Sequence, residues 1–319
     1  MPIFDPMAVR VLELVPNFSE GRDPGVIAEI CDAMTRAGAS VVHTTSDPDH
    51  HRSVVTAFGS PRAVEDAAIA AASIAIGRID LRRHQGVHPR IGALDVLPFV
   101  PMVGTTIEDA RAVARRVAER LAAELGLPAY LYAAASDPPG RGLAELRRGG
   151  FEALVTGWPD DRRPDALPAD WPYPGAHPTA GVVCVGARMP LLAWNVELEG
   201  VSLPGARRIA AAIRERGGGF AGLRALAFEL ASRGTVQISM NLEDPRVTSP
   251  VAVLAMIEAL AAAEGGGVVR TEIIGLMPDE MALDAAADRF RIGLSLADRL
   301  LSRRLVEYLA ELPSPTEQD

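Results

Sequence analysis

Residues 9–24, VRVLELVPNFSEGRDP, encode the first elements of a pattern that runs through the whole chain. The apolar residues Val9 to Val15 predict a strand, and the proline and glycine that follow them predict a turn. Asp23 can cap a helix, and Pro24 suits the first helical turn. We therefore expect a strand, a turn and then a helix that ends near Arg36.

Further strands and helices follow in a regular order. In the first half we expect strands at Ala39–Thr45, Arg52–Phe58, Gly92–Phe99 and Ala129–Tyr132, with helices that begin at Ser60-Pro61 and at a capping box formed by Thr105 and Glu108. In the second half we expect strands at Val182–Leu198, Leu223–Leu230, Thr235–Leu242 and Val268–Leu276, helices at Pro204–Arg216 and Ser249–Ala263, and a helical tail to Leu312. Between the halves, the proline-rich residues 159–181 predict an irregular loop.

The order β-α-β-β-α-β therefore occurs twice, with an α-β extension in the first copy and a helical tail in the second. This is the order of the split-βαβ, ferredoxin-like unit, in which helices cover one face of a sheet. We predict an α+β fold with two ferredoxin-like subdomains, residues 1–181 and 182–319, packed side by side with a ligand cleft between them.

The composition is that of an acidic globular protein. The chain has 319 residues, 48% of them hydrophobic, and a net charge of −9 at pH 7. A nucleic-acid partner would require a basic face, whereas the arginines are spread along the expected helices. No apolar run reaches the roughly 18 residues of a membrane span, and the first residues lack the features of a secretion signal. We expect no membrane association and a cytoplasmic location.

All 32 basic residues are arginine. Without lysine, Schiff-base chemistry, lysine-bound pyridoxal phosphate and a P-loop lysine are excluded. Cys31 and Cys184 are far apart in apolar surroundings, so buried free thiols are expected in place of a disulfide or a metal site. Any general-base or covalent role falls to His, Asp, Glu, Ser, Tyr or Cys.

The polar turn before the expected strand at residues 92–99 contains two histidines, His84 and His88. Their spacing is that of a metal pair on a helix, but Gly86 and Pro89 argue against a helix here. A lone imidazole can shuttle protons near neutral pH, and Arg90 could bind a carboxylate through its planar guanidinium. The same residues could instead cap a loop and form a surface ion pair, and the spacing alone leaves both interpretations open.

Other polar residues occupy places where a ligand could bind. Asn17 precedes a helix start and residues 47–52 form a polar hairpin tip, but simple capping explains the first, and a solvated turn the second, more readily than a ligand site does. Gln237 is one of three polar residues that alternate along a strand, which indicates a solvent face or a wet cleft. Glu272 lies within an apolar strand, where a carboxylate requires a partner or a chemical role.

Together these segments resemble the formiminotransferase domain, glutamate formimidoyltransferase, from about residue 9 to residue 288. The segments that carry the resemblance are Val15–Arg22, Asp47–Thr56, Ile79–Leu81 with His84, His88–Val96, Pro128–Tyr132, His177–Gly181, Gly186–Arg188, Asn195, Gln237–Leu242, Gly275-Leu276 and Leu283–Ala286. These motifs are long and keep the family's order along the chain.

The resemblance implies a homodimer that transfers the formimino group of N-formimino-L-glutamate to N5 of tetrahydrofolate, its co-substrate, with no metal. It places the catalytic histidine at His88, in a His-Pro-Arg motif, and a polar position near the reacting groups at Glu272. The folate-contacting stretch corresponds to residues 172–181, which include His177, Thr179 and Gly181.

The residue chemistry and the resemblance lead to one hypothesis. His88 transfers a proton between two nitrogens, and Glu272 orients a nitrogen or polarises the histidine. Because both substrates are anionic and the protein is acidic, local arginines are needed to bind them. The candidates for these carboxylates are Arg52, Arg90 and Arg188, and the candidates for pterin or amidine contacts are Asn17 and Gln237.

The sequence also departs from the family pattern. His51 stands where the family usually has Asn, and the Trp-rich loop, residues 158–171, matches poorly. The cyclodeaminase domain that is fused to some relatives is missing, so a separate protein would perform the deaminase step. Two other functions remain as alternatives: a metal-dependent hydrolase of a formimino or amide bond that uses His84 and His88, and a non-catalytic folate-binding module.

Overall fold

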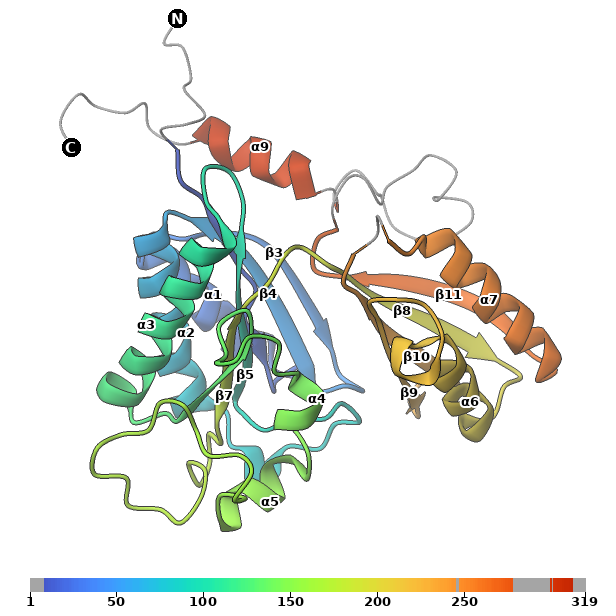
Figure 1. Ribbon diagram of the computed structural model, residues 1–319, viewed down its shortest axis with the longest axis horizontal. Coiled ribbons are helices and arrows are strands. Elements are labelled where there is room, and N and C mark those ends of the chain that lie inside the picture. The colour runs from blue at the N-terminus through green and yellow to red at the C-terminus, as the bar shows by residue number, and fades with distance from the viewer. Residues whose placement is uncertain (1–8, 245–246, 278–298, 300, 312–319) are drawn as a thin grey trace, which may run out of the picture. The chain divides into compact units, whose positions relative to one another are not determined.

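The computed structural model describes residues 9–244, 247–277, 299 and 301–311 (Figure 1). The chain divides into two compact units, the first ending at Met189 and the second running Pro190–Leu312. Each unit combines helices with one sheet, which confirms the expected α+β class. None of the described helices has both the length and the apolar character that crossing a membrane requires.

The first unit is built on a mixed sheet. Its elements in chain order are β1 (Leu12–Leu14), β2 (Asn17–Phe18), α1 (Pro24–Arg36), β3 (Ser40–Asp47), β4 (Arg52–Gly59), α2 (Pro61–Arg78), the 3₁₀ turn η1 (Leu81–Arg83), β5 (Leu94–Pro101), α3 (Ile107–Leu125), β6 (Ala129–Ala133), α4 (Leu143–Leu146), α5 (Gly150–Thr156) and β7 (Val183–Ala187). β1 and β2 both pair antiparallel with β4 on one side and β5 on the other. β3 extends the sheet beyond β4, while β7 and β6 add parallel strands beyond β5.

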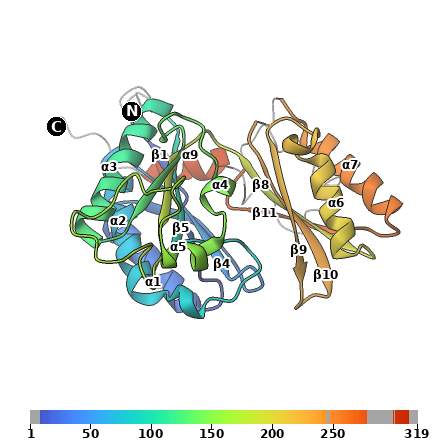
Figure 2. The same ribbon diagram turned by 60° about the horizontal axis from the view of Figure 1, so that its bottom comes forward.

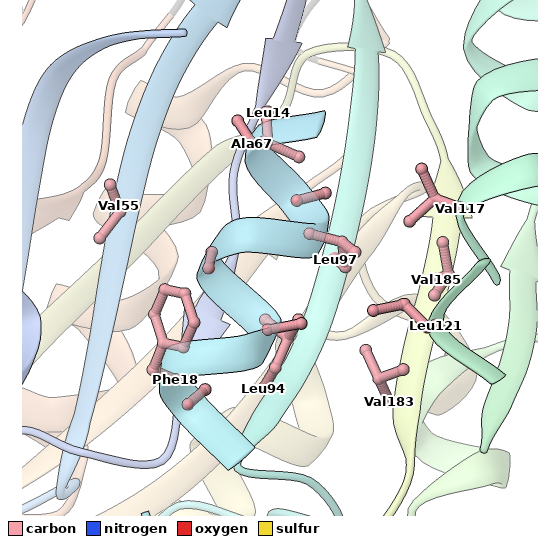
Figure 3. Packing of buried hydrophobic residues seen from close by; sticks show 14 of the residues in the cluster. Leu14, Phe18, Val55, Ala67, Leu94, Leu97, Val117, Leu121, Val183 and Val185 are labelled. Carbon is pink, nitrogen blue, oxygen red and sulfur yellow. The ribbon is translucent and has the colours of Figure 1, made fainter. Parts of the chain in front are cut away.

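One face of this sheet is covered by α1, α2 and α3 (Figures 1 and 2). Their apolar side chains pack against strand residues such as Phe18 and Leu97 (Figure 3). Because side chains alternate between the faces of a strand, Val183 and Val185 join this core while Cys184 points to the other face. Complete burial of Phe18 alone contributes roughly 1.5–3 kcal/mol.

The opposite face carries α4, α5 and the polar residues of interest. Side chains from these short helices pack with Val96 and Cys184 in a second cluster. Asn17 stands opposite both Val54 and Val96 in the sheet, so the three side chains point to the same face. Arg52 lies two residues before Val54 on β4 and therefore points the same way.

The start of α3 corrects one expectation. The capping box expected from Thr105 and Glu108 is wrong by one residue, because Thr106 and Asp109 form it. The Thr105 hydroxyl instead donates to the carbonyl oxygen of Val11 at 2.7 Å. This tertiary contact holds the segment before α3 against the start of the chain's first strand.

The second unit has the β-α-β-β-α-β order that the sequence predicts. Its elements are β8 (Leu192–Glu199), α6 (Leu203–Ile213), the 3₁₀ turn η2 (Glu215–Gly217), β9 (Leu223–Leu230), β10 (Thr235–Leu242), α7 (Pro250–Ala263), β11 (Gly267–Ile274) and α9 (Leu301–Glu311). The sheet runs β11-β8-β10-β9, with every neighbouring pair antiparallel. Trp194 and Ile238 join residues of α6 and α7 in its core. The family segment at 283–286 lies outside the described residues.

The single strand expected at Val182–Leu198 is wrong. β7 ends at Ala187 and β8 begins at Leu192, and the two strands belong to different sheets. Pro190 lies in the break, where it has no backbone N–H to give to a ladder. Because β7 completes the first sheet, the units divide after residue 189, whereas the sequence places the boundary after residue 181.

Candidate active site

The hairpin between β3 and β4 positions the first group of polar residues. The Asp47 carboxylate accepts the backbone N–H groups of Asp49 and His50, each at 2.8 Å, which stabilises the turn. His51 follows with a φ of 49°, a left-handed conformation that Asn adopts more readily than most residues. Arg52 then begins β4 with its side chain 11% exposed.

Asn17, Arg52, Asp95 and Arg147 form a buried polar group that we call the Arg52 cluster. Nη1 of Arg52 donates to Oδ2 of Asp95 at 2.7 Å, and Nη2 donates to Oδ1 of Asn17 at 2.8 Å. Nη2 of Arg147, which follows α4, donates to the same Asp95 oxygen. Two guanidinium groups thus share one carboxylate, and one positive charge of the cluster is uncompensated.

The Asp95 carboxylate is the anionic centre of this cluster. Burial by itself raises the pKa of Asp95, but the charges of Arg147 and Arg52 and the hydrogen bonds to the carboxylate together lower it by more. The backbone N–H of Ile91 also donates to Oδ1, at 2.9 Å. The pKa of Asp95 therefore lies well below its usual range, and the carboxylate is ionised at neutral pH.

His88 lies near the Arg52 cluster, in the turn after η1. Its Nδ1 is 2.8 Å from the carbonyl oxygen of Pro89, which can only accept a hydrogen bond. The proton of the neutral ring is thus assigned to Nδ1, and Nε2 is the basic nitrogen. Burial, together with the charges of Arg52 and Arg147, holds the pKa of His88 well below its usual value. His88 is therefore neutral at pH 7.

The turn that carries His88 is fastened to the hairpin. Nε2 of His84 lies 2.8 Å from the carbonyl oxygen of His51, and the two rings stack with their centroids 4.3 Å apart. Burial lowers the pKa of His84 to about 4, so the stacked ring is neutral at pH 7. Gly86 allows the close approach, because a Cβ there would lie 2.3 Å from the carbonyl oxygen of His50.

Residues 177–181 pair with residues on either side of the same turn. The backbone N–H of Leu81 donates to the carbonyl oxygen of Thr179 at 2.9 Å. Nδ1 of His177 accepts backbone N–H groups, the nearer at 3.0 Å, so its Nε2 carries the proton when the ring is neutral. Gly181 has a φ of +71°, and a Cβ there would clash with a carbonyl oxygen 2.0 Å away. This segment therefore holds η1 before the turn of His88 and the residues that follow the turn.

Aromatic rings gather around His177. The ring centroids of Trp171 and Tyr173 are 5.1 Å apart, and those of Tyr173 and His177 are 6.0 Å apart. Nε1 of Trp171 donates to the carbonyl oxygen of Gly175 at 2.7 Å, while Tyr173 is 40% exposed. The group presents accessible aromatic surface beside the backbone of the His177 segment.

The two other arginines expected to bind anions have partners within the chain. Arg90 donates to Oε1 of Glu152 at 2.7 Å and lies 5.9 Å from the centre of the Phe151 ring. Arg188, just after β7, donates to the carbonyl oxygen of Met189 at 3.0 Å. Neither arginine belongs to the Arg52 cluster.

Gln237 and Glu272 lie in the second unit, on the sheet face away from its helix-packed core. Asn195 on β8 stands opposite Glu272 on one side and Ser239 on the other, so the three share a face with Gln237. Gln237 is 1% exposed. Oε2 of Glu272 is buried and accepts no hydrogen bond within the described part of the chain.

Metal-binding side chains do not converge in the described residues. Across residues 9–244, 247–277, 299 and 301–311, no three His, Cys, Asp or Glu side chains lie together as a metal ion would require. Cys31 and Cys184 are free thiols, as expected, but only Cys184 is buried as expected, because Cys31 is half-buried.

Family models match both units. A model described as the formiminotransferase domain, N-terminal subdomain, matches residues 11–188, and one described as the formiminotransferase domain matches residues 193–292. The chain belongs to the formiminotransferase family. The gap between the two matches contains residue 189, where the first unit of this formiminotransferase ends.

Named relatives agree with this membership. A glutamate formimidoyltransferase from Streptococcus pyogenes serotype M1 is 37% identical over 87% of this chain and 92% of that protein. One from Thermoplasma acidophilum is 38% identical over 87% of this chain and 91% of that protein. A formimidoyltransferase-cyclodeaminase from Sus scrofa is 35% identical over 97% of this chain but only 61% of its own length. This formiminotransferase thus spans nearly all of the first two relatives and part of the third.

Sequence reasoning missed two members of the Arg52 cluster, Asp95 and Arg147. Asp95 occupies an apolar strand, and the argument applied to Glu272 could have found it, because a buried carboxylate requires a partner. Arg147 gave no such signal, since an Arg-Arg pair at the end of a helical segment is typical of a solvated surface. Its role depends on contacts with residues far away in the chain.

Proposed function

We propose that this formiminotransferase moves the formimino group of N-formimino-L-glutamate to N5 of tetrahydrofolate. The observation that carries the proposal is a neutral histidine, His88, next to a buried cluster with an uncompensated positive charge. A neutral base suits proton transfer between nitrogens, and the positive charge suits an anionic donor. The names of the relatives from S. pyogenes and T. acidophilum support the same activity.

The reaction requires one proton to move between two nitrogens. N5 of tetrahydrofolate attacks the amidine carbon, a C–N bond forms, and the electrons of the C=N bond move to the imino nitrogen. Nε2 of His88 takes the proton that N5 loses. The same ring then donates this proton to the departing glutamate nitrogen, and the C=N bond re-forms as the C–N bond to glutamate breaks. No covalent intermediate with the protein is needed.

Arginines bind the carboxylates of the anionic substrates in this proposal. Arg52 places its charge near His88, and holding the donor in line supplies much of the rate. Arg90 and Arg188 are the other candidates, and Arg90 would exchange its contact with Glu152 for a substrate carboxylate. Asn17, held against Arg52, is a candidate for contact with the amidine or the pterin.

The folate is proposed to contact the segment of His177, Thr179 and Gly181. The aromatic rings around His177 offer a surface on which a pterin or benzoyl ring can stack. Nε2–H of His177 offers a hydrogen-bond donor, because Nδ1 already accepts backbone N–H groups. Tetrahydrofolate acts here as a co-substrate, and no metal takes part.

We further infer that both units are ferredoxin-like. The strand order β11-β8-β10-β9 supports this for the second unit. In the first unit, β1 and β2 lie between β5 and β4, β3 follows β4, and each of these neighbouring pairs is antiparallel, which supports the same arrangement. A ligand cleft between the units would allow Glu272 to orient a reacting nitrogen and Gln237 to contact the pterin. A homodimer, a cytoplasmic location and a separate cyclodeaminase complete the proposal.

The test replaces His88 by Ala and measures formimino transfer from N-formimino-L-glutamate to tetrahydrofolate. We expect kcat to fall by about 10²–10⁴-fold, because this is the usual contribution of a general acid–base group. His43→Gln on β3, outside the turn, is the matched control, and circular dichroism monitors folding. Near-normal turnover by a folded H88A variant would refute the shuttle, and no transfer by the wild-type protein would refute the function.

A further inference from the structure

Arg147 has unused hydrogen-bonding capacity in a buried place. Its side chain is 13% exposed, and its Nη2 donates to Asp95. Within the described residues, its buried Nε has no acceptor. Because a buried N–H of a charged group is costly to leave unpaired, this guanidinium group keeps hydrogen-bonding capacity that the described residues do not satisfy.

A second arginine holds Arg147 in place. Arg162 is 5% exposed, and its Nη1 donates to the carbonyl oxygens of residues 145, 146 and 148 at 3.1, 3.0 and 2.7 Å. The carbonyl oxygen of Arg162 accepts the hydroxyl of Tyr130 at 2.8 Å. The backbone on both sides of Arg147 is therefore fixed before any ligand arrives, which lowers the entropy lost on binding.

The charges around Arg147 favour an anion. Arg147 and Arg52 share the single carboxylate of Asp95, so a second carboxylate would balance the cluster. The charge of Arg147 acts on the His88 ring, which places the unbalanced charge within electrostatic reach of the proposed proton shuttle. An anion bound here would lie near the reacting nitrogens.

We propose that Arg147 binds a carboxylate of the glutamate part of the donor through its guanidinium group. A carboxylate accepts such a charge-assisted hydrogen bond at a guanidinium group with more than ordinary strength. The proposal rests on the proposed function and extends it to a residue outside the motifs that carry the family resemblance. Arg147 acts here in substrate binding, and the proton transfer remains with His88.

The neighbouring arginine provides a matched control. Arg148 has the same side chain, but it is 61% exposed and its Nη1 donates to Asp161 at 3.1 Å. Replacing either residue by Gln removes one positive charge from the same short segment. The effects of the two substitutions should therefore differ only through the buried position of Arg147.

The experiment compares the wild-type protein with R147Q, R147K and R148Q. In R147Q we expect the KM for N-formimino-L-glutamate to rise by roughly 30- to 100-fold, with the KM for tetrahydrofolate within about twofold. R147K keeps the charge but not the planar fork, so its KM should lie between those of wild type and R147Q. R148Q should behave as wild type. Titration calorimetry with L-glutamate, the product, should show the same order of affinities.

The outcomes separate this proposal from the proposed function. If wild type transfers the formimino group and R147Q keeps the wild-type KM for the donor, the role of Arg147 is refuted while the function stands. If both KM values of R147Q rise equally, its effect is structural and the proposal is again refuted. If wild type binds L-glutamate through Arg147 but transfers nothing, the function fails and the carboxylate site stands. If the wild-type protein shows neither formimino transfer nor glutamate binding, the proposed function and the Arg147 proposal are both refuted.

Discussion

At the scale of single residues, Glu13 destabilises the folded protein at a pH where its buried carboxyl ionises. It lies inside β1, opposite Phe58 and Val100, with only 6% of its surface exposed. Burial raises the pKa of Glu13 to about 7, and the charge of Arg188 offsets only part of this effect. The folded protein therefore binds this proton more tightly than the unfolded chain does.

The sign of the resulting pH dependence follows from linkage. The pKa of Glu13 is about 7 in the folded protein, above the ordinary value of 4.5. The protonated Glu13 carboxyl therefore stabilises the folded protein at low pH, and this stability is lost as the pH rises from 4.5 to about 7. Glu13→Gln should therefore raise the free energy of unfolding at pH 8 by up to about 3 kcal/mol, at about 1.4 kcal/mol per pKa unit, with little effect at pH 4.5.

Urea unfolding of both proteins at pH 4.5 and pH 8 measures this difference. Glu119→Gln on the exposed side of α3 is the control, and its effect should stay within about 0.5 kcal/mol at either pH. An E13Q variant that is less stable than wild type at pH 8 would contradict the buried, proton-binding environment of Glu13.

At the scale of elements, the site depends on the turn of residues 84–90 meeting the hairpin between β3 and β4. The sequence predicted both segments, because turn residues and alternating apolar residues are local signals. Their contact has no local signal, since it joins His84 to the carbonyl oxygen of His51 across 33 residues of chain. The short helices α4 and α5 were missed for a related reason, because their stability comes from packing on the sheet.

Gly86→Ala should test this contact. The new Cβ would lie 2.3 Å from the His50 carbonyl oxygen, so the turn must move and take His88 with it. We expect kcat to fall by at least about tenfold, because misplacement by 1 Å can cost a factor of about a hundred. Circular dichroism and steady-state kinetics measure the outcome.

Gly77→Ala in α2 is the matched control, because its added Cβ meets nothing within 4 Å. It should leave kcat unchanged and stabilise the helix by about 0.5–1 kcal/mol. Wild-type kcat in G86A would show that the turn can relax without moving the reacting histidine.

At the scale of the whole molecule, the proposed reaction uses a histidine that transfers a proton and arginines that bind the substrates, and it uses no metal. Elemental analysis of the purified protein should therefore find far less than one zinc per chain, and treatment with EDTA should leave formimino transfer unchanged. Loss of activity to the chelator, restored by zinc, would favour the alternative metal-dependent hydrolase. His84, one of the ligands that this alternative requires, lies with its Nε2 against a backbone carbonyl oxygen.

The sequence by itself determined the α+β class, most helix and strand positions and the candidacy of His88, because each depends on residues close together in the chain. Only the tertiary structure decided where the first unit ends and which charges meet. Arg52 and Arg147 reach Asp95 across 43 and 52 residues. Such contacts form when strands and short helices pack on one sheet face, and this packing produces no periodic pattern in the amino-acid sequence.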